Sequence, residues 1–312
     1  FNKHSGFSKM KFLNYFKLWK KIYKISEKTF LKGQLVYDLS FFRNAVFWLS
    51  KTGISNIFRT MASYNSKNIN NKYIEQIMNR FATYTGSSPY KTPAFMNQLA
   101  VVEMVNGAYF PKDGIYSIPS ALHQLCKDLG VNFFYNEKII SIDLRKENIT
   151  VKTQNNIFKS KLSISNVDFH VTQKLLGREN TITFKELSTS AIVFYWGIKG
   201  EFKELKLHNI IFSADYQKEF DEIFNQSSIP SDPTIYINIS SKLDKSHAPS
   251  GCENWFVMVN IPPKPDLVTA SEIQRVKNLI IKQIDNRYNV YLEKLIEFED
   301  VLTPQGLSLI HI

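Results

Sequence analysis

The stretch that decides the fold lies between Gly114 and Asp168 and begins Gly114-Ile-Tyr-Ser-Ile-Pro-Ser-Ala-Leu-His-Gln-Leu-Cys-Lys-Asp-Leu-Gly-Val131. Apolar residues recur at helical spacing between Ile118 and Leu129, which predicts a helix over these residues. Gly130 follows directly and is the residue type that most readily adopts the left-handed conformation at a helix end. The sequence therefore predicts a helix with a defined end, followed by shorter, strand-like runs.

The residues after this helix are typical of strands. Residues 131–135 form a short apolar run, residues 139–144 and 149–153 predict a hairpin around a polar turn, and residues 161–165 alternate as in a further strand. The turn Ser165-Asn-Val-Asp168 comes at the carboxyl end of that last strand, where open α/β sheets bind ligands. Its Asn and Asp could either stabilise the turn or reach a ligand.

Toward the carboxyl end the pattern predicts a second sheet with helices. Three β-rich runs, bounded by Pro and Gly, cover residues 191–197, 234–239 and 255–260. Residues 215–224 and 270–288 predict helices. An acidic cluster near the end of the chain is typical of a solvated helix end: Glu293, Glu297, Glu299 and Asp300.

Toward the amino end the chain predicts helices over residues 10–65. The polar, Asn-rich residues 63–71 predict a loop, and residues 73–84 predict a further helix that Gly86 and Pro89 end. The first helix carries aromatic residues on one face and lysines on another. This pattern is compatible with a surface helix whose lysines are solvated, with a helix lying on an anionic membrane surface, or with nucleic-acid binding. No recognised nucleic-acid module accompanies the charge, so we expect no nucleic-acid partner.

The charge of +11 belongs to the first quarter of the chain. Residues 1–80 hold 15 Lys or Arg against 3 Asp or Glu, whereas residues 81–312 hold 24 against 25. Such a basic block indicates an anionic partner. The longest apolar stretch, 41–49, is interrupted by Arg43 and Asn44 and is far shorter than a membrane span. Two cysteines, Cys126 and Cys252, predict reduced thiols in a cytosolic protein.

The two ends of the chain suggest an internal fragment. Phe1 is not an initiator Met, and no signal peptide is evident. The last residues, Leu307-Ser-Leu-Ile-His-Ile312, match the translation of a transposon-end adapter used in sequencing libraries, with an authentic apolar tail as the alternative. We therefore expect any glycine-rich phosphate-binding loop to lie outside this chain.

Common catalytic signatures are absent from the sequence. It contains no GxSxG, HExxH, P-loop or GxGxxG pattern, and its six histidines are scattered without metal-ligand spacing. We therefore expect no metal site, and we do not expect a hydrolase built on a standard motif.

Several phrases together resemble a known family. Four segments resemble FAD-dependent carotenoid desaturases of the phytoene desaturase family. They are the phrase Arg80-Phe-Ala-Thr-Tyr-Thr-Gly-Ser-Ser-Pro-Tyr90, the Gly114–Val131 helix, the Ser165–Asp168 turn and the segment Asp244-Lys-Ser-His-Ala-Pro-Ser-Gly251. The sequence that leads into the Gly114–Val131 helix departs from the family pattern at position 113, where Asp stands in place of the family's first Gly. The Arg80–Tyr90 phrase is most similar to the subgroup that desaturates 1-hydroxycarotenoids at the 3,4 bond.

The resemblance implies a fold, a cofactor and site residues. The fold is a mixed α+β, partial FAD/NAD(P)-binding, two-domain flavoprotein of amine-oxidase-like architecture, with a helical substrate or membrane region and a mixed β-sheet substrate domain. The cofactor is FAD, and the residues expected to contact it are Ile139, Ser165, Asn166 and Asp168. No catalytic residue can be assigned, because helix packing explains Arg80, Tyr84 and Tyr90 equally well.

The same resemblance implies a division of the chain. We expect a basic helical substrate- or membrane-facing region at 1–80, a connector at 81–109, a discontinuous FAD-domain segment at 110–175, substrate-domain sheet and helices at 176–306, and adapter-derived residues at 307–312. The expected activity is desaturation of a carotenoid polyene, either 3,4-desaturation of a 1-hydroxycarotenoid or phytoene-type desaturation, by a cytoplasmic, peripheral membrane enzyme, with the fragment inactive alone. The alternatives are a carotenoid isomerase or retinol saturase of the same fold, or a non-catalytic membrane-surface lipid-binding protein.

Overall fold

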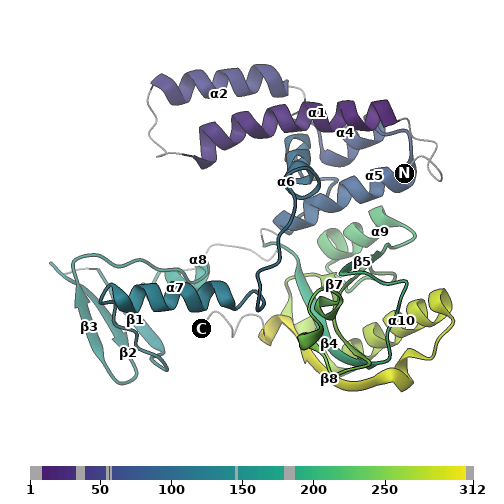
Figure 1. The fold of residues 1–312 in the computed structure, drawn as a ribbon. Coiled ribbons are helices and arrows are strands. Elements are labelled where there is room, and N and C mark those ends of the chain that lie inside the picture. Colours follow the sequence, from purple (N-terminus) through teal and green to yellow (C-terminus); the bar gives the residue numbers. More distant parts are fainter. Residues whose placement is uncertain are drawn as a thin grey trace.

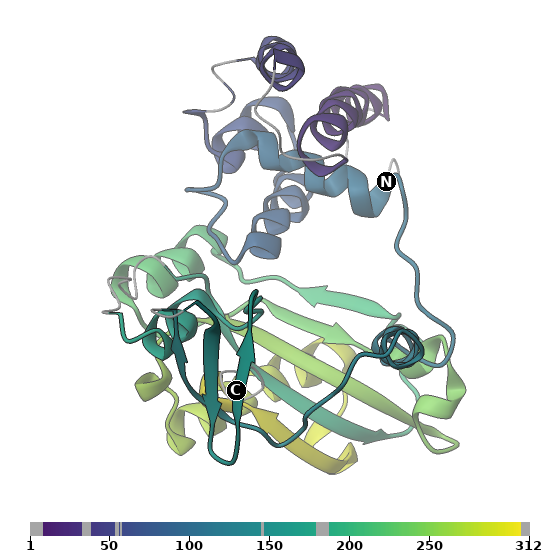
Figure 2. The same cartoon turned by 90° about the vertical axis from the view of Figure 1, so that its left-hand side faces the viewer.

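The computed structural model describes residues 9–32, 39–53, 56, 58–144, 147–178 and 187–306, so the predicted adapter residues 307–312 lie outside it. Figure 1 shows three parts: a layer of helices, a unit built on helix α7 with a small sheet, and a larger sheet with its own helices. Both Figure 1 and Figure 2 place the α7 unit on one side of the larger sheet and helix α10 on the other.

The helical layer contains the first half of the described helices. They are α1 (Lys9–Ser26), a π-helical turn η1 (Glu27–Leu31), α2 (Leu39–Thr52), α4 (Met61–Asn68), α5 (Lys72–Asn79), the 3-10 helices η2 (Arg80–Thr85) and η3 (Ala94–Gln98), and α6 (Leu99–Met104). Gly53 and Gly86 adopt positive φ at the ends of α2 and η2, as predicted. No described helix is long and apolar enough to cross a membrane.

The aromatic face of α1 forms the core of this layer. Trp19 is 0 % exposed, and Tyr15 and Phe16 are buried with it against Tyr64 of α4. The lysines of α1 remain outside. Of the alternatives for this helix, the surface helix describes α1, because the rings of Tyr15, Phe16 and Trp19 are buried in protein and are not presented to a lipid surface.

The predicted loop at 63–71 is largely helical, which corrects the sequence interpretation. The side chain of Thr60 caps the first turn of α4 by accepting from the amide of Ser63 at 3.2 Å. Asn65 is fully buried: its Oδ1 accepts from Tyr15, and its Nδ2 donates to Asn79 and Asn97. Its polarity serves a buried network and does not mark a solvated loop.

The α7 unit consists of α7 (Ser117–Asp128), a three-stranded antiparallel sheet of β1 (Ile139–Asp143), β2 (Ile149–Thr153) and β3 (Ile157–Ser160), and α8 (Phe169–Leu175). The predicted helix and hairpin are confirmed. The strands predicted at 131–135 and 161–165 are not formed, because neither run pairs with a described strand. Helix α7 has no buried residue.

The larger sheet is antiparallel, with strand order β5-β6-β7-β4-β8. Its strands are β4 (Ser190–Lys199), β5 (His208–Ile211), β6 (Ile235–Asn238), β7 (Cys252–Ile261) and β8 (Ile296–Leu302). Its helices are α9 (Tyr216–Asp221), which continues into the π-turn η5 (Glu222–Gln226), and α10 (Ala270–Tyr288); short 3-10 helices are η6 (Ser240–Lys242), η7 (Lys245–His247), η8 (Pro265–Leu267) and η9 (Leu292–Leu295).

Alternation gives this sheet two different faces. Residues such as Phe194, Trp196, Trp255 and Val257 point to the face that α10 covers and form a closed aliphatic and aromatic core with Ile280. The intervening residues point to the opposite face. That second face is the one that carries the candidate site.

Three of the four residues of the predicted acidic cluster lie in a strand, whereas Glu293 lies in the 3-10 helix η9. Glu297, Glu299 and Asp300 belong to β8, which pairs with β4. Glu299 accepts from Nε1 of Trp196 at 2.7 Å and pairs with Lys277. The prediction failed because the carboxylate of Glu299 satisfies a neighbouring indole and a lysine from α10.

Candidate functional site

The face of the larger sheet opposite α10 is lined by aromatic rings. Tyr195 of β4 and Phe256 of β7 are cross-strand partners with ring centroids 5.6 Å apart, and Tyr236 of β6 lies 6.2 Å from Phe256. Phe298 of β8 lies opposite Gly197. We call Tyr195, Tyr236, Phe256 and Phe298 the aromatic face. Side chains on this face are half-buried or exposed, so it is available to a ligand.

The helical layer adds a cation to this face. The guanidinium of Arg80 lies 5.4 Å from the ring centroid of Tyr236 and 6.0 Å from that of Tyr84. Tyr84 donates a hydrogen bond to Glu103, and burial, with that carboxylate, raises the pKa of Tyr84 to about 12. Burial also raises the pKa of Tyr236, although Arg80 opposes it. Both phenols are therefore protonated at neutral pH and can donate but not accept a proton.

An apolar pocket of about 440 Å³ occupies one end of the aromatic face. Tyr195, Phe256 and Phe298 form its walls. A Cβ at Gly197 would lie 3.1 Å from the Cβ of Phe298, so this glycine lets the Phe298 ring lie across the sheet. The pocket also has a polar end, formed by η6 and η7 and including His247.

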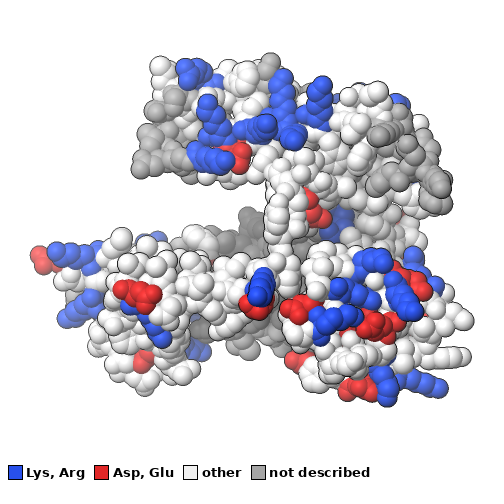
Figure 3. Space-filling view, in the orientation of Figure 1, with Lys and Arg blue, Asp and Glu red and all other residues white. Residues whose placement is uncertain are grey.

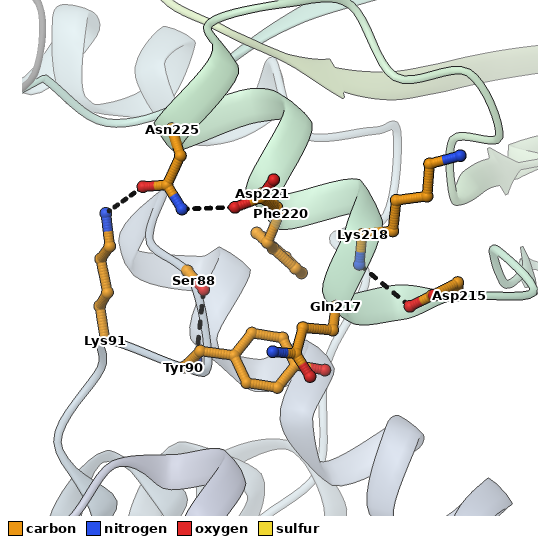
Figure 4. Close-up of a pocket in the computed structure, with 9 residues that line it drawn as sticks. All are labelled: Ser88, Tyr90, Lys91, Asp215, Gln217, Lys218, Phe220, Asp221 and Asn225. Atoms are coloured by element: carbon orange, nitrogen blue, oxygen red, sulfur yellow. Dashed lines mark hydrogen bonds between the residues drawn. The ribbon is translucent and has the colours of Figure 1, made fainter.

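A second pocket lies between the helical layer and α9, and its lining is polar. Figure 4 shows Asn225 between Lys91, which donates to it, and Asp221, which accepts from it. The ammonium of Lys218 points away from Lys91 in the same view, so the two cations do not converge on a common point. The amide of Asn225 therefore bridges Lys91 and Asp221, and this polar pocket is a weaker candidate than the apolar pocket.

The four predicted cofactor residues lie in the α7 unit and are exposed. Ile139 begins β1, an edge strand whose outer side pairs with no described strand. Ser165 shares a hydrogen bond of 2.8 Å with Thr172, and Asp168 precedes α8 without capping it through its side chain. Helix α8 packs against β1. The structure thus brings the elements that carry Ile139 and the Ser165–Asp168 turn side by side.

The sequence interpretation missed the aromatic face. Tyr195, Tyr236 and Phe256 lie within the predicted β-rich runs, at positions that alternate with the buried residues. An aromatic ring on the exposed side of several strands was the available signal. The order of the strands in the sheet, which brings these rings together, could not be read from the sequence.

Comparison with known proteins identifies the family to which the chain belongs. The model of the family described as flavin-containing amine oxidoreductase matches residues 14–202, more than half of the chain. The chain is 36% identical to a 1-hydroxycarotenoid 3,4-desaturase of Flavobacterium sp. (strain P99-3), over 92% of this chain and 60% of the relative. It is 28% identical to a 4,4'-diaponeurosporene oxygenase of Staphylococcus aureus (strain USA300), over 80% of this chain and 52% of the relative.

Solved structures show the same fold at low identity. An oxidoreductase from Methanosarcina mazei superposes with a TM-score of 0.53 at 12% identity, covering 86% of this chain and 62% of that one. A cofactor-binding redesign of putrescine oxidase gives 0.55 at 8% identity, covering 94% and 61%. These matches confirm the amine-oxidase-like architecture predicted from the sequence. The chain spans somewhat over half the length of the relatives it matches. On the extent of the family match, the chain belongs to the flavin-containing amine oxidoreductase family.

Proposed function

We propose that this chain is part of an FAD-dependent desaturase that introduces double bonds into a carotenoid polyene, with 3,4-desaturation of a 1-hydroxycarotenoid as the specific reaction. The observation that carries the proposal is the 36% identity to a 1-hydroxycarotenoid 3,4-desaturase along 92% of the chain. The aromatic face supports it independently. A conjugated chain has no polar groups to hydrogen-bond and is best held by rings that exclude water.

The flavin would supply the chemistry that side chains cannot, since removal of two hydrogens from an unactivated carbon pair needs a hydride acceptor. The chain's own residues bind and orient the polyene. Tyr195, Phe256 and Tyr236 form an apolar surface along which it can lie. The cation–π contacts of Arg80 with Tyr84 and Tyr236 place a cation beside that surface, while the two phenol hydroxyls bond to Glu103 and His208.

The α7 unit fits the cofactor side of such an enzyme. The outer edge of β1 leaves main-chain groups at Ile139 available to an adenine edge, and an apolar side chain is compatible with that contact. Because the Asp168 side chain does not cap α8, the carboxylate is not used in stabilising the turn. We propose that Ile139, Ser165, Asn166 and Asp168 contact FAD.

The exposed apolar residues of this unit support the proposed division of the chain. The whole of α7 lacks buried residues, and Val131 and Ile164 are exposed in runs whose sequence is typical of strands. Figure 3 shows a deep notch between the helical layer and the α7 unit. We propose that residues 110–175 are a discontinuous part of the FAD domain, completed by segments outside this chain, and that residues 176–306 form the substrate domain.

We also propose that the helical layer rests on a membrane surface, with α2 as the contact. Leu39, Phe42, Val46 and Leu49 share one face of α2, and Leu39 and Val46 are 86% and 64% exposed. Lys and Arg side chains gather over this layer in Figure 3. Apolar side chains bordered by cations are the composition that binds an anionic lipid interface.

Pigment analysis of the full-length gene in a carotenoid-producing host tests the activity. We expect a 1-hydroxycarotenoid to lose two hydrogens, with a red-shifted absorbance. Phe256→Ser should reduce conversion, whereas Tyr291→Ser, at an exposed tyrosine away from the aromatic face, should not. An oxygenated product with no new double bond would favour the oxygenase chemistry named for the Staphylococcus relative, and an unchanged pigment would refute both.

Flavin titration tests the division of the chain. The 312-residue chain should bind FAD weakly or not at all, because the phosphate-binding glycines would lie outside it. Tight quenching of flavin fluorescence by this chain would contradict the proposal.

Vesicle flotation tests the membrane contact. The full-length protein should bind vesicles that contain anionic lipid more strongly than zwitterionic ones, and Val46→Ser should weaken this binding. Tyr73→Ser, at an exposed aromatic residue of α5, is the matched control. Equal flotation of both variants would exclude α2 as the contact.

A further inference from the structure

The polar end of the apolar pocket is a small hydrogen-bonded group. Oγ of Ser240 accepts from Nδ2 of Asn254 at 2.7 Å and lies 2.9 Å from Nδ1 of His247. Oδ1 of Asn254 accepts from the amide of Ser241 at 2.9 Å. These contacts use both ends of the Asn254 amide and fix one nitrogen of the imidazole.

The other imidazole nitrogen has spare hydrogen-bonding capacity. Among the described residues no hydrogen-bond partner lies on Nε2 of His247, and the nearest carboxylate oxygen, on Asp244, is 3.7 Å away, which is beyond hydrogen-bond distance. Oδ1 of Asp244 accepts from the amide and hydroxyl of Ser246, which holds that acid in its own turn. His247 is 24% exposed and lines the pocket beside the rings of Phe256 and Phe298.

A polar group with spare hydrogen-bonding capacity at one end of a largely apolar pocket favours a ligand that carries a polar group at one end of an apolar body. A buried donor or acceptor without a partner costs free energy, so a hydrocarbon end that displaces water from His247 leaves the imidazole unsatisfied. An alcohol both donates and accepts. It therefore satisfies Nε2 in either tautomer of the neutral ring, whereas a carbonyl could pair with only one of them.

We propose that His247, positioned by Ser240 and Asn254, hydrogen-bonds the terminal hydroxyl of the polyene substrate and so selects hydroxylated over unhydroxylated ends. This inference rests on the proposed function, because it takes the polyene to lie on the aromatic face. It assigns the apolar pocket to the hydroxylated end of the substrate and gives its polar end a role in specificity.

The test compares two substrates in the full-length enzyme. With His247→Leu, kcat/KM for a 1-hydroxylated polyene should fall about tenfold, the effect of losing one hydrogen bond, while kcat/KM for the unhydroxylated counterpart stays within about twofold. His247→Gln, which keeps an amide nitrogen near the position of Nε2, should retain most of the preference. Lys245→Leu is the matched control, since it changes an exposed side chain of the same short helix.

Flavin content and melting temperature, measured on each variant, separate recognition from folding. Equal loss with both substrates, loss of bound flavin, or an unchanged substrate ratio in His247→Leu would each overturn the inference. If the wild-type enzyme converts neither polyene, the proposed function fails and the inference fails with it. An active wild type with the same substrate ratio as His247→Leu overturns the inference alone.

Discussion

The buried carboxyl of Glu219 makes the stability of this chain depend on pH. The Glu219 side chain lies in α9, only 2% exposed, and accepts hydrogen bonds from the amide and hydroxyl of Thr234 at 2.8 and 2.6 Å. Its pKa is raised from 4.5 to about 7, mainly by burial and to a smaller extent by the nearby acids Asp232 and Glu222, while the two hydrogen bonds from Thr234 oppose the shift. The folded chain therefore holds a proton that the unfolded chain releases at lower pH.

The direction and size of the effect follow from this difference. A carboxyl with a raised folded pKa gives stability that is fully present below pH 4.5 and is lost as the pH rises through about 7. A shift of this size corresponds to about 3 kcal/mol of unfolding free energy. Glu219→Gln keeps an acceptor for Thr234 and cannot ionise. We expect it to match the wild type near pH 4 and to be more stable by about 3 kcal/mol at pH 8.

Urea unfolding at several pH values measures this, with fluorescence of the buried Trp196 and Trp255 reporting on the larger sheet. Glu204→Gln is the control, because Glu204 is exposed and should show no pH-dependent difference. A gap between Glu219→Gln and the wild type that stays constant from pH 5 to pH 8 would refute the reasoning.

Two further substitutions test packing and charge, again by urea unfolding. Gly86→Ala should lower the free energy of unfolding by about 2–4 kcal/mol, because Gly86 has a positive φ and an added Cβ would overlap the side chain of Ser188. Gly130→Ala is the control: its Cβ meets no neighbouring atom, so it should cost only about 1 kcal/mol of backbone strain. Similar losses in the two variants would contradict the predicted overlap. Lys242→Ala should lower the free energy of unfolding by about 3–5 kcal/mol, because it leaves the buried Glu253 without its cation. The double variant Lys242→Met with Glu253→Gln should recover much of that loss. No recovery would show that packing, and not charge, determines the loss.

Local signals in the sequence predicted the elements whose cause is local. Helix α7 ends at Gly130, whose φ is positive, and α10 spans the predicted residues 270–288. Runs of β-forming residues bounded by Pro and Gly predicted β4 and β7, and each of these strands has one face that is buried along most of its length. In these segments periodicity, caps and turn residues favour the same structure.

Predictions failed where distant residues decide. Asn65 has the same local chemistry as a loop asparagine, and only its partners at positions 15, 79 and 97 make it a core residue. Strand β8 is acidic because Lys277 and Trp196 lie next to it in space. Residues 131–135 have strand-like sequence without a described partner, and a strand needs one.

The candidate site could be predicted only in part for the same reason. The resemblance named residues of the α7 unit, which are contiguous in motifs, whereas the aromatic face joins β4, β6, β7 and β8 with Arg80 of the helical layer. Antiparallel pairing of strands far apart in sequence brings these rings onto one surface. No window of sequence contains that surface, although each strand contributes one of its rings.

The two faces of the larger sheet explain why the site lies where it does. Helix α10 covers one face, and the core between helix and sheet stabilises this part of the chain. The other face does not contribute to that core, so it can hold half-buried aromatic rings. The helical layer touches that free face through Arg80, and the segment between α6 and α7 touches it where the ring centroid of Phe110 lies 5.9 Å from that of His247. Both neighbouring parts therefore meet the sheet on the side opposite α10. A ligand on the aromatic face would therefore lie close to residues of the helical layer and of the segment that leads into α7.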